Sequence, residues 1–364
     1  MPLVFCIYTK YTEQNLTWED FMTIRKFLKS LSVFAAASLL SSASVFGSNA
    51  DIGRAFESFT DKMTEVLPET TTQLGVWSDA YIGKLFPSAP PHFGIGLTVS
   101  GTFMNTKEFS STAEAIVNEI NGKTPGASKD FNFSIPNTIP FPAYSINARL
   151  GGIILPFDVG LYGSYLKINS LKFEDFTGTI TYYSFGGDIR YAVMKGSTLL
   201  PKISVGTGYI YTHMALGADG SSTYTSDLTA HGIPGVNTAS VTANTDMNTK
   251  FDLHTLFVQA QVSKKFFILT PYAGLRAYVT ASKSHYDYAY SSTYKAGALS
   301  GNVPGGSGSD GHDYNSNGFA WGKIQPQLYT GLGLNIFFFD CTVGGCWNPR
   351  TNLWSANVSA RFKL

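Results

Sequence analysis

Charged residues at the polar positions of alternating segments are the part of this sequence that best suits ligand chemistry. They are Arg149, Asp188, Arg190, Arg276, Arg361 and Lys363. A period of two places such residues on one face of a β-strand, and guanidinium groups bind a carboxylate through paired N–H donors. These residues therefore predict either a ligand-carboxylate site or solute filter, or a face of solvated or mutually ion-paired side chains.

Other residue types that do chemistry form no recognisable site. The 6 histidines are scattered without an HExxH spacing, and no GxSxG motif stands out. Histidines and aspartates gather in Gly- and Ser-rich segments, where solvated loop residues are the ordinary interpretation; they are His231, His285, Asp310, His312 and Asp313. We therefore predict no catalytic residue, no metal site and no cofactor, and an enzyme is the last of the alternatives.

Cys341 and Cys346 would form a disulfide only if their segment is a loop. In a strand they have opposite parity and lie ~17 Å apart at ~3.3 Å per residue, which excludes a bond. We favour the strand and expect two thiols buried as small apolar side chains.

The elements that position the charges are β-strands of a membrane barrel. From Trp354 to Leu364 apolar and polar residues alternate without exception, as expected of a strand with one face in lipid and one in a lumen. Alternation of this kind predicts ten strands with both chain ends on the periplasmic side. They cover 93–104, 144–154, 157–168, 180–193, 203–213, 254–263, 267–280, 324–336, 338–347 and 354–364.

The connections fall into two classes, as in bacterial outer-membrane barrels. Short turns occur near Pro156, Lys195, Lys264 and Phe337, and a further turn covers 348–351. Long segments rich in Gly, Ser, Asn and Tyr are expected as extracellular loops, and they cover 105–142, 215–249 and 282–318. Additional strands could lie within them, 238–248 first, and a helix is a candidate at 111–120. We therefore predict an all-β, transmembrane antiparallel barrel of 10–14 strands.

A soluble β-sandwich or secreted lectin also alternates and is the rival fold. Against it, the alternating segments are about twice as long as an ordinary strand of about 5–6 residues, and about ten tilted residues cross a bilayer. Charged residues make up only 14% of the chain, against about 25% in soluble domains. The net charge of +1 and the lack of a basic patch exclude nucleic acid as a partner.

The N-terminal region predicts export. Arg25, Lys26 and Lys29 precede an apolar stretch and small residues that end at Ala50, which is typical of a signal peptide cleaved after that residue. We therefore divide the chain into an upstream start artefact, a signal peptide, a helical plug or hatch-like segment and the barrel. These cover 1–21, 22–50, 51–91 and 92–364, respectively.

Residues 51–91 and Pro326 carry the remaining structural expectations. Apolar residues recur at helical spacing from Ile52 to Val66 and predict a helix that ends at Pro68, followed by a helix or loop at 74–85. We favour a plug in the lumen over a helix on the periplasmic rim. Pro326 cannot donate to a strand ladder and predicts either the start or kink of a strand, or a bulge that opens the wall sideways.

The export signal, about forty residues ahead of the barrel, and the terminal runs QLYTGLGLNIFFF and NLWSANVSARFKL together resemble FadL-type outer-membrane proteins, the long-chain fatty-acid transporter family. The family's Asn-Pro-Ala-Gly signature is missing, and only Leu74–Leu85 occupies a comparable place. The resemblance transfers no ligand-binding residue. It implies passive uptake of a hydrophobic substrate past an N-terminal plug, with sideways or inward release.

The partners expected on this reading are the outer-membrane bilayer, a hydrophobic small molecule and the barrel-assembly machinery, which would engage strand 354–364. Two alternatives stay open. A general diffusion porin for small polar solutes would need an open aqueous lumen, which a mobile or rim-lying 51–91 favours. A surface adhesin or structural barrel would act through its long loops, 282–318 above all.

Overall fold

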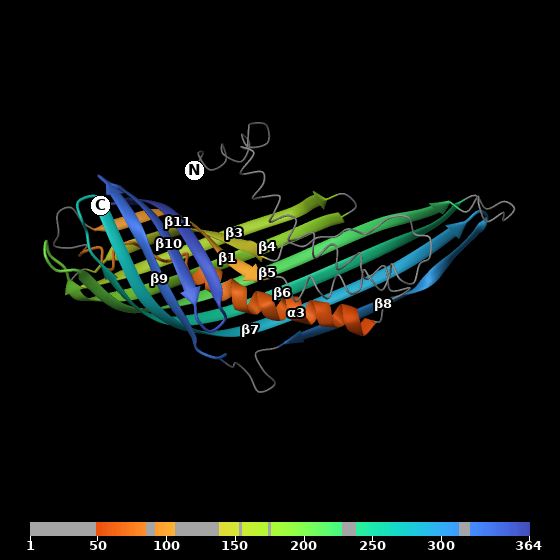
Figure 1. The fold of residues 1–364 in the computed structure, drawn as a ribbon, viewed down its shortest axis with the longest axis horizontal. Helices are drawn as coiled ribbons and strands as arrows, with labels where there is room; N and C mark the ends of the chain where they lie inside the picture. Colours follow the sequence, from red (N-terminus) through yellow and green to blue (C-terminus); the bar gives the residue numbers. More distant parts are fainter. Residues whose placement is uncertain are drawn as a thin grey trace.

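The fold is that of a computed structural model, which describes residues 49–84, 92–105, 138–152, 155–173, 176–227, 238–312 and 321–364 (Figure 1). In this part of the chain one helix, α3 (Asn49–Thr72), precedes a single antiparallel sheet. The strands are β1 (Phe93–Asn105), β2 (Thr138–Gly151), β3 (Phe157–Phe173), β4 (Phe176–Lys195), β5 (Lys202–Asp227), β6 (Thr238–Ser263), β7 (Leu269–Ala296), β8 (Leu299–His312), β9 (Gln325–Ile336), β10 (Phe339–Asn348) and β11 (Leu353–Lys363).

The sheet closes on itself. β1 pairs with β11 in an unbroken register from Gly94↔Lys363 to Phe103↔Trp354. β7 pairs with both β6 and β9, whereas the pairing described for β8 is with β7 alone. Ten strands therefore form the ring, and β8 extends the sheet beside it. The prediction of an all-β antiparallel barrel within 10–14 strands is confirmed.

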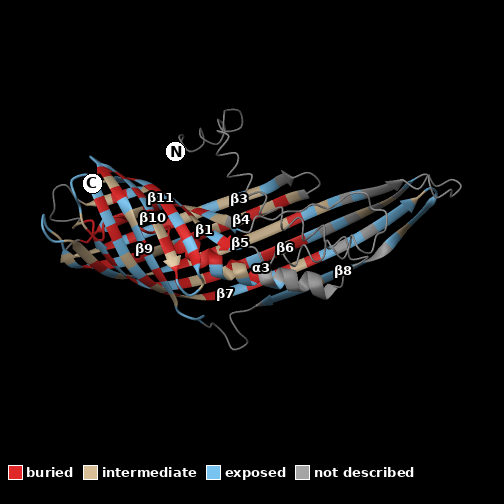
Figure 2. Cartoon of the chain, viewed as in Figure 1, coloured by how far each residue is buried: buried red, intermediate tan, exposed pale blue. Residues whose placement is uncertain are grey.

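Burial alternates along every wall of the barrel, which Figure 2 shows as a chequered pattern. In β11 the outward Trp354 and Val358 are 57% and 56% exposed, while the inward Asn357 and Arg361 are buried. The same parity holds for the other strands that close the ring, because side chains of successive residues point to opposite faces. The outward face is apolar and the inward face is polar near one end of the barrel.

The two ends of the barrel differ. The turns β2–β3, β4–β5, β6–β7 and β9–β10 share one end with Phe93 and Leu364, and we call it the turn end. The connections β1–β2, β5–β6 and β8–β9 leave the other end, which we call the loop end. At the turn end the β9–β10 connection consists of Phe337 and Phe338 only.

One side of the barrel is much taller than the other, and here the sequence prediction was wrong. β5, β6 and β7 contain 26, 26 and 28 residues, against 10 in β10 and 11 in β11. The expected loops 215–249 and 282–318 are therefore mostly strand, and 238–248 is the first part of β6 rather than a separate strand. Above the apolar band the outward residues of these strands are polar, such as Lys283 and His285 on β7, while inward residues such as Tyr288 stay buried. The apolar outward face that marks a membrane strand is therefore missing there, although the backbone ladder continues.

Three further expectations were wrong in detail. Cys341 and Cys346 do lie on opposite faces as free thiols, but Cys341 is exposed on the outer face and only Cys346 is buried. β7 begins at Leu269, because Phe267 takes a positive φ of 55° in the preceding turn. α3 passes Pro68 and ends at Thr72. The candidate helix 111–120 lies outside the described residues.

α3 continues beyond Pro68 although proline removes one backbone donor. In this last turn two threonine hydroxyls bond to backbone carbonyls of the helix. Thr70 Oγ1 donates to Val66 O at 2.9 Å, and Thr72 Oγ1 donates to Glu69 O at 3.1 Å. None of the helical residues described here forms a span long and apolar enough to cross a bilayer.

Candidate functional site

The last turns of α3 and the residues that follow it, up to Lys84, lie inside the ring of strands. The first part of α3 lies along the taller strands β6 and β7, beyond the ends of β10 and β11 (Figure 1). Near the loop end, Phe59 of α3 contacts Phe251 of β6, with ring centroids 6.5 Å apart. Further down, the hydroxyl oxygens of Thr70 and of Thr102 on β1 are hydrogen-bonded at 2.7 Å. At the turn end, the amide of Ala80 donates to a β6 serine at 2.9 Å. The segment therefore runs lengthwise through the barrel, from the loop end to the turn end.

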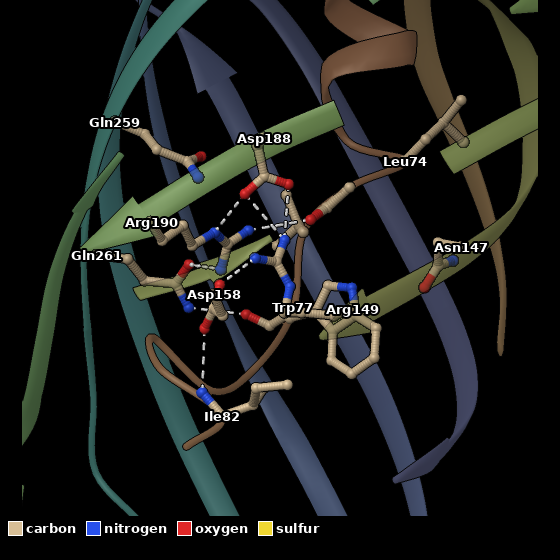
Figure 3. A network of polar contacts seen from close by, with 12 residues as sticks. Leu74, Trp77, Ile82, Asn147, Arg149, Asp158, Asp188, Arg190, Gln259 and Gln261 are labelled. Atoms are coloured by element: carbon tan, nitrogen blue, oxygen red, sulfur yellow. Dashed lines mark hydrogen bonds and ion pairs between the residues drawn. The ribbon is translucent and has the colours of Figure 1, made fainter. Parts of the chain in front are cut away.

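A buried ion network occupies the lower part of the lumen (Figure 3). Arg149 of β2 donates to Asp158 of β3 and, through Nη2 at 2.7 Å, to Asp188 Oδ1 of β4. Arg190 Nε donates to Asp188 Oδ2 at 2.9 Å. The side chains of all four residues are at most 1% exposed. Three neighbouring strands thus place two guanidinium groups against two carboxylates away from water.

Glycine at position 160 leaves room for this network. A Cβ atom there would lie 2.5 Å from Arg149 Nη2 and 2.5 Å from Asp188 Oδ1. Real Cβ atoms do not approach other atoms so closely, so a larger residue would displace the ion pair. The close approach of the charges to the β3 backbone therefore depends on Gly160.

Three arginines of the wall bind backbone carbonyls of the segment that follows α3. Arg276 Nη1 of β7 donates to Thr72 O at 2.7 Å, and Arg190 Nη2 of β4 donates to Gly75 O at 3.0 Å. Arg361 Nη2 of β11 donates to Val76 O. Thr72 ends the helix, so its carbonyl has no partner inside the helix and binds a cation favourably, whereas Gly75 and Val76 lie beyond the helix end. The wall thereby holds this segment from three directions.

Aromatic rings complete the environment of two of these arginines. The Arg361 guanidinium lies 4.5 Å from the ring centroid of Trp77, which is itself buried. Arg276 lies 5.0 Å from each of the ring centroids of Phe257 and Tyr329. Arginine stacks on aromatic faces more readily than lysine because its planar cation is weakly hydrated.

At the turn end, Asp79 lies between two ammonium groups. Lys202 Nζ is 2.9 Å from Asp79 Oδ1, and Lys363 Nζ is 2.6 Å from Oδ2. Burial acts to raise the pKa of Asp79, yet the two ammonium groups outweigh it and hold that pKa well below its usual range. Next to it, Asp340 accepts hydrogen bonds from Ser78 Oγ at 2.8 Å and from Lys363 Nζ at 3.2 Å.

We call this lower region the charged base. It consists of the ion network and the lysine–aspartate group, namely Asp79, Arg149, Asp158, Asp188, Arg190, Lys202, Asp340, Arg361 and Lys363. Every side chain of it pairs with an opposite charge or with the segment inside the ring. The charged base therefore leaves none of these groups aimed at an empty lumen.

Above the charged base the inward face becomes apolar. We call this region the apolar upper core, formed by Phe59, Met63, Val66 and Leu67 of α3 with Ile210, Met214, Met247, Phe251 and Leu253 of the wall. These side chains are at most 8% exposed. On β6 the change is visible along one face, because Phe251 and Leu253 are followed after a few residues by Gln259 and Gln261.

One carboxylate lies below this apolar contact. Glu69 accepts hydrogen bonds from Tyr278 Oη at 2.8 Å, from Gln327 Nε2 and from Asn348 Nδ2. Burial raises the pKa of Glu69 above its ordinary value in spite of these three donors. The carboxylate therefore sits among neutral donors, in contrast to Asp79.

The charged residues of the alternating segments that the sequence analysis singled out all lie on the inward face, but they do not form one site. Arg149, Asp188 and Arg190 belong to a single network, Arg361 reaches it through Trp77, and Arg276 lies apart with Gln259 and Gln327. Sequence reasoning missed Glu69, Asp79, Asp158 and Asp340. Asp158 and Asp340 each stand second in a strand, which was the available signal for them.

Pro326 and the scattered histidines lie elsewhere. Pro326 is the second residue of β9, pairs with Ala277 of β7 and is exposed; the β9–β10 pairing starts two residues further, at Leu328. His285 is half exposed at the outer face, 3.9 Å from Asp287, and Asp310 is exposed. His231 and Asp313 lie outside the described residues, as does the side chain of His312. Among the described residues no group of three or more His, Cys, Asp or Glu side chains could hold a metal.

Comparison with known proteins identifies no family. No protein-family model and no curated protein matches the chain. Among solved structures, a FadL homologue from Pseudomonas aeruginosa has 10% identity, covers 79% of this chain and 97% of its own, and gives a TM-score of 0.24. The P. putida toluene transporter TodX has 9% identity, with 78% and 93% covered and a TM-score of 0.25. The translocator domain of autotransporter NalP from Neisseria meningitidis has 8% identity, with 77% and 91% covered and a TM-score of 0.28. At these identities and scores the likeness carries no argument about substrate or mechanism.

Proposed function

We propose that this protein is an outer-membrane barrel for passive uptake of hydrophobic small molecules, of which long-chain fatty acids are the representative class. The observation that carries the proposal is the apolar upper core. Inward residues such as Ile210, Met214 and Phe251 are apolar where the lumen of a porin would be wetted and polar. A ligand that displaces α3 would meet apolar side chains along the wall.

The proposal also includes closure of the barrel to polar solutes, and the charged base supports this part. Residues 72–78 are held by Arg190, Arg276 and Arg361 and by Gln261 Nε2, which donates to Trp77 O at 2.7 Å. In this proposal the arginines position the plug and do not themselves form a ligand-carboxylate site or solute filter. A barrel of this size filled by side chains passes polar solute poorly.

The apolar outward face supports insertion of the barrel in the outer membrane. The proposal includes export by the signal peptide 22–50, an upstream start artefact at 1–21, a plug at 51–91 and a barrel at 92–364. Strand 354–364 would engage the assembly machinery. N-terminal sequencing of the protein isolated from outer membranes should give a mature end after Ala50, and an intact N-terminus would contradict the signal-peptide assignment.

The primary test compares two activities of the full chain in liposomes. We expect transfer of a fluorescent fatty acid across the vesicle wall without swelling in small sugars. Swelling without transfer would make the protein a general porin, and neither activity would contradict transport altogether. Vesicles without protein, and vesicles with heat-denatured protein, are the controls.

A disulfide lock tests whether α3 must move. Thr70 and Thr102 place their hydroxyl oxygens 2.7 Å apart, so the pair Thr70→Cys/Thr102→Cys can form a bond in a background of Cys341→Ala and Cys346→Ala. We expect the oxidised lock to abolish fatty-acid transfer and a reductant to restore it. The single variant Thr102→Cys, treated in the same way, is the matched control. Undiminished transfer through the locked barrel would refute the moving plug.

Release through the wall at Pro326 is part of the proposal. Its support is the position of Pro326, which lies beyond the first β9–β10 pair at Leu328. We expect Pro326→Ala to transfer the fatty acid more slowly because alanine restores a ladder donor. Equal transfer rates for the variant and the parent would end the lateral-opening idea.

A second function, binding of a surface partner, is favoured by the tall side of the barrel. β5, β6 and β7 are more than twice as long as β10 and β11, and β8 widens them at the loop end (Figure 1). Shortening the β7–β8 hairpin by removing 289–308 tests it. Loss of binding to host cells or surfaces with transfer intact would establish an adhesin; unchanged binding would exclude one that acts through this hairpin.

A further inference from the structure

Two phenylalanines at the turn end occupy backbone positions that disfavour them. Phe267 in the β6–β7 turn has φ = 55°, and Phe337 in the β9–β10 turn has φ = 51°. In this left-handed region a Cβ atom crowds the backbone, so glycine and asparagine are the usual residues of such turns. The backbone conformation therefore does not explain why phenylalanine occupies these two positions. The explanation must lie in what the aromatic side chain contacts.

Other turns of the same chain provide the internal comparison. The β10–β11 turn, at the opposite end, reaches a positive φ of 54° with Asn352, and the β4–β5 and β7–β8 turns use Gly196 and Gly297. These residues suit the conformation. The exception is thus confined, among the described turns, to two hairpins at the turn end.

The same two side chains are almost fully exposed. Phe267 is 92% exposed and Phe337 is 96% exposed, so neither gains anything from packing within the protein. The two hairpins are neighbours, because the Asn335 amide beside Phe337 donates to Ile268 O beside Phe267 at 2.7 Å. Together they form an apolar tip, which we call the phenylalanine tip.

The phenylalanine tip is continuous with the outward apolar face. Phe338 and Phe339 lie next to Phe337, and their ring centroids are 5.9 Å and 6.2 Å from that of Phe362 on β11. Phe339 is 64% exposed on the outer face. On β9, β10 and β11 no polar residue separates the turn from the lipid-facing band, because the outward residues next to the turn are Ile336, Phe339 and Phe362.

The height of the lipid-facing band indicates that lipid covers the phenylalanine tip. On β10 the outward residues run from Phe339 to Trp347, eight residues apart. At ~3.4 Å per residue and a tilt of about 40° this gives a height of ~21 Å, whereas the apolar band of such barrels is about 25 Å tall. The missing few ångströms correspond to the projection of a turn. A band that ended at the first strand residue would be too short for the bilayer.

We propose that the phenylalanine tip, Phe267 and Phe337 with their neighbours, inserts into the inner leaflet of the outer membrane and sets how deep the barrel sits. This rests on the membrane location proposed above. Lys265, exposed beside Phe267, would meet the lipid headgroups, as basic residues next to interfacial aromatics do. A periplasmic protein that covers the same tip is the competing occupant, and the test separates the two.

The test uses a nitroxide label at a single cysteine in the full chain, with Cys341→Ala and Cys346→Ala, reconstituted in phosphatidylcholine–phosphatidylglycerol vesicles. We expect labels at Phe337→Cys and Phe267→Cys to be more accessible to oxygen than to a water-soluble nickel chelate. A label at Asn352→Cys should show the reverse preference. Nickel-accessible labels at both phenylalanine positions would overturn the proposal in favour of a periplasmic partner.

A label at Val343→Cys, on the outer face of β10 and 60% exposed, serves as a control for the membrane location. It distinguishes failure of the phenylalanine-tip proposal from failure of the proposed membrane location. Oxygen preference at Val343 with nickel preference at Phe337 would refute only the phenylalanine tip. Nickel preference at both would refute the membrane barrel itself.

A second variant removes the side chains without harming the backbone. Asparagine suits a positive φ, so Phe267→Asn/Phe337→Asn should fold as the parent does. We expect a lower urea midpoint than the parent in vesicles, with no loss in detergent micelles, which adapt to the protein surface. An unchanged midpoint in vesicles would show that the side chains do not contact lipid.

Discussion

The two parts of the lumen are built from the same strands but by opposite means. The charged base fixes residues 75–82 through ion pairs and hydrogen bonds, while the apolar upper core packs against α3 from Phe59 to Leu67. Buried ion pairs depend on geometry, and removing one partner leaves the other charge unpaired. Apolar contacts tolerate substitution and rearrangement far better. The difference indicates a fixed seal below and an exchangeable apolar contact above.

The largest effect is expected when one carboxylate is removed from the ion network of the charged base. Asp188→Asn takes a carboxylate from both Arg149 and Arg190, so we expect the free energy of unfolding to fall by about 3–5 kcal/mol and sugar-driven swelling to appear. Urea unfolding in vesicles measures the first effect. Ser184→Ala, on the same inward face of β4 and bonded at 3.1 Å to Thr212, is the matched control. Equal loss in both variants would mean that the ion network does not hold the seal.

A substitution in the apolar upper core should lower the stability of the protein without making the barrel permeable to sugars. Met214→Ala removes a side chain that is 1% exposed beside α3, so we expect a loss of about 2–3 kcal/mol, altered affinity for a fluorescent fatty acid and no swelling. Val258→Ala, on the outward face of β6, is the control for loss of apolar volume. Swelling of vesicles that contain the Met214 variant would contradict the idea that the charged base alone closes the lumen to sugars.

The pH dependence of the base follows from Asp79. Its folded pKa is depressed, so the pairs with Lys202 and Lys363 contribute stability above the usual aspartate pKa of about 3.9, and the contribution is lost as pH falls through the folded pKa. We expect Asp79→Asn to lose about 1.5–3 kcal/mol at pH 7, with the difference from the parent shrinking below about pH 4. Urea midpoints over that range, with the exposed Asp61→Asn as control, provide the measurement.

The smallest effect is expected at Glu69. Its folded pKa is raised by burial, so the ionised form counts against folding at neutral pH, and the parent gains stability as pH falls through that pKa. We expect Glu69→Gln to change stability by less than about 1 kcal/mol at pH 7, because the new amide oxygen can still accept from Tyr278 and Asn348. A loss as large as that of Asp79→Asn would show that Glu69 belongs with the charged base.

Local pattern predicted the barrel well where one face is apolar. The alternation in 354–364 correctly placed Trp354 and Val358 outside and Asn357 and Arg361 inside, because parity depends only on neighbouring residues. It failed in the upper parts of β6 and β7, where the outward residues are polar and only the inward face is buried. Composition there resembles loops, and only hydrogen bonds to the next strand make it sheet.

The sequence by itself determined the strands that close the ring, the faces of their side chains and the inward position of Arg149, Asp188, Arg190, Arg276 and Arg361. The tertiary structure alone decided the partner of each charge. Ser78 and Asp340 meet across 262 residues, and Arg361 reaches Val76 across 285. Such contacts follow from barrel closure and from the path of α3 through it, and no local period encodes either of them. From the sequence alone, an inward arginine could bind a ligand carboxylate or a carbonyl of its own chain. The choice depends on which segment fills the lumen.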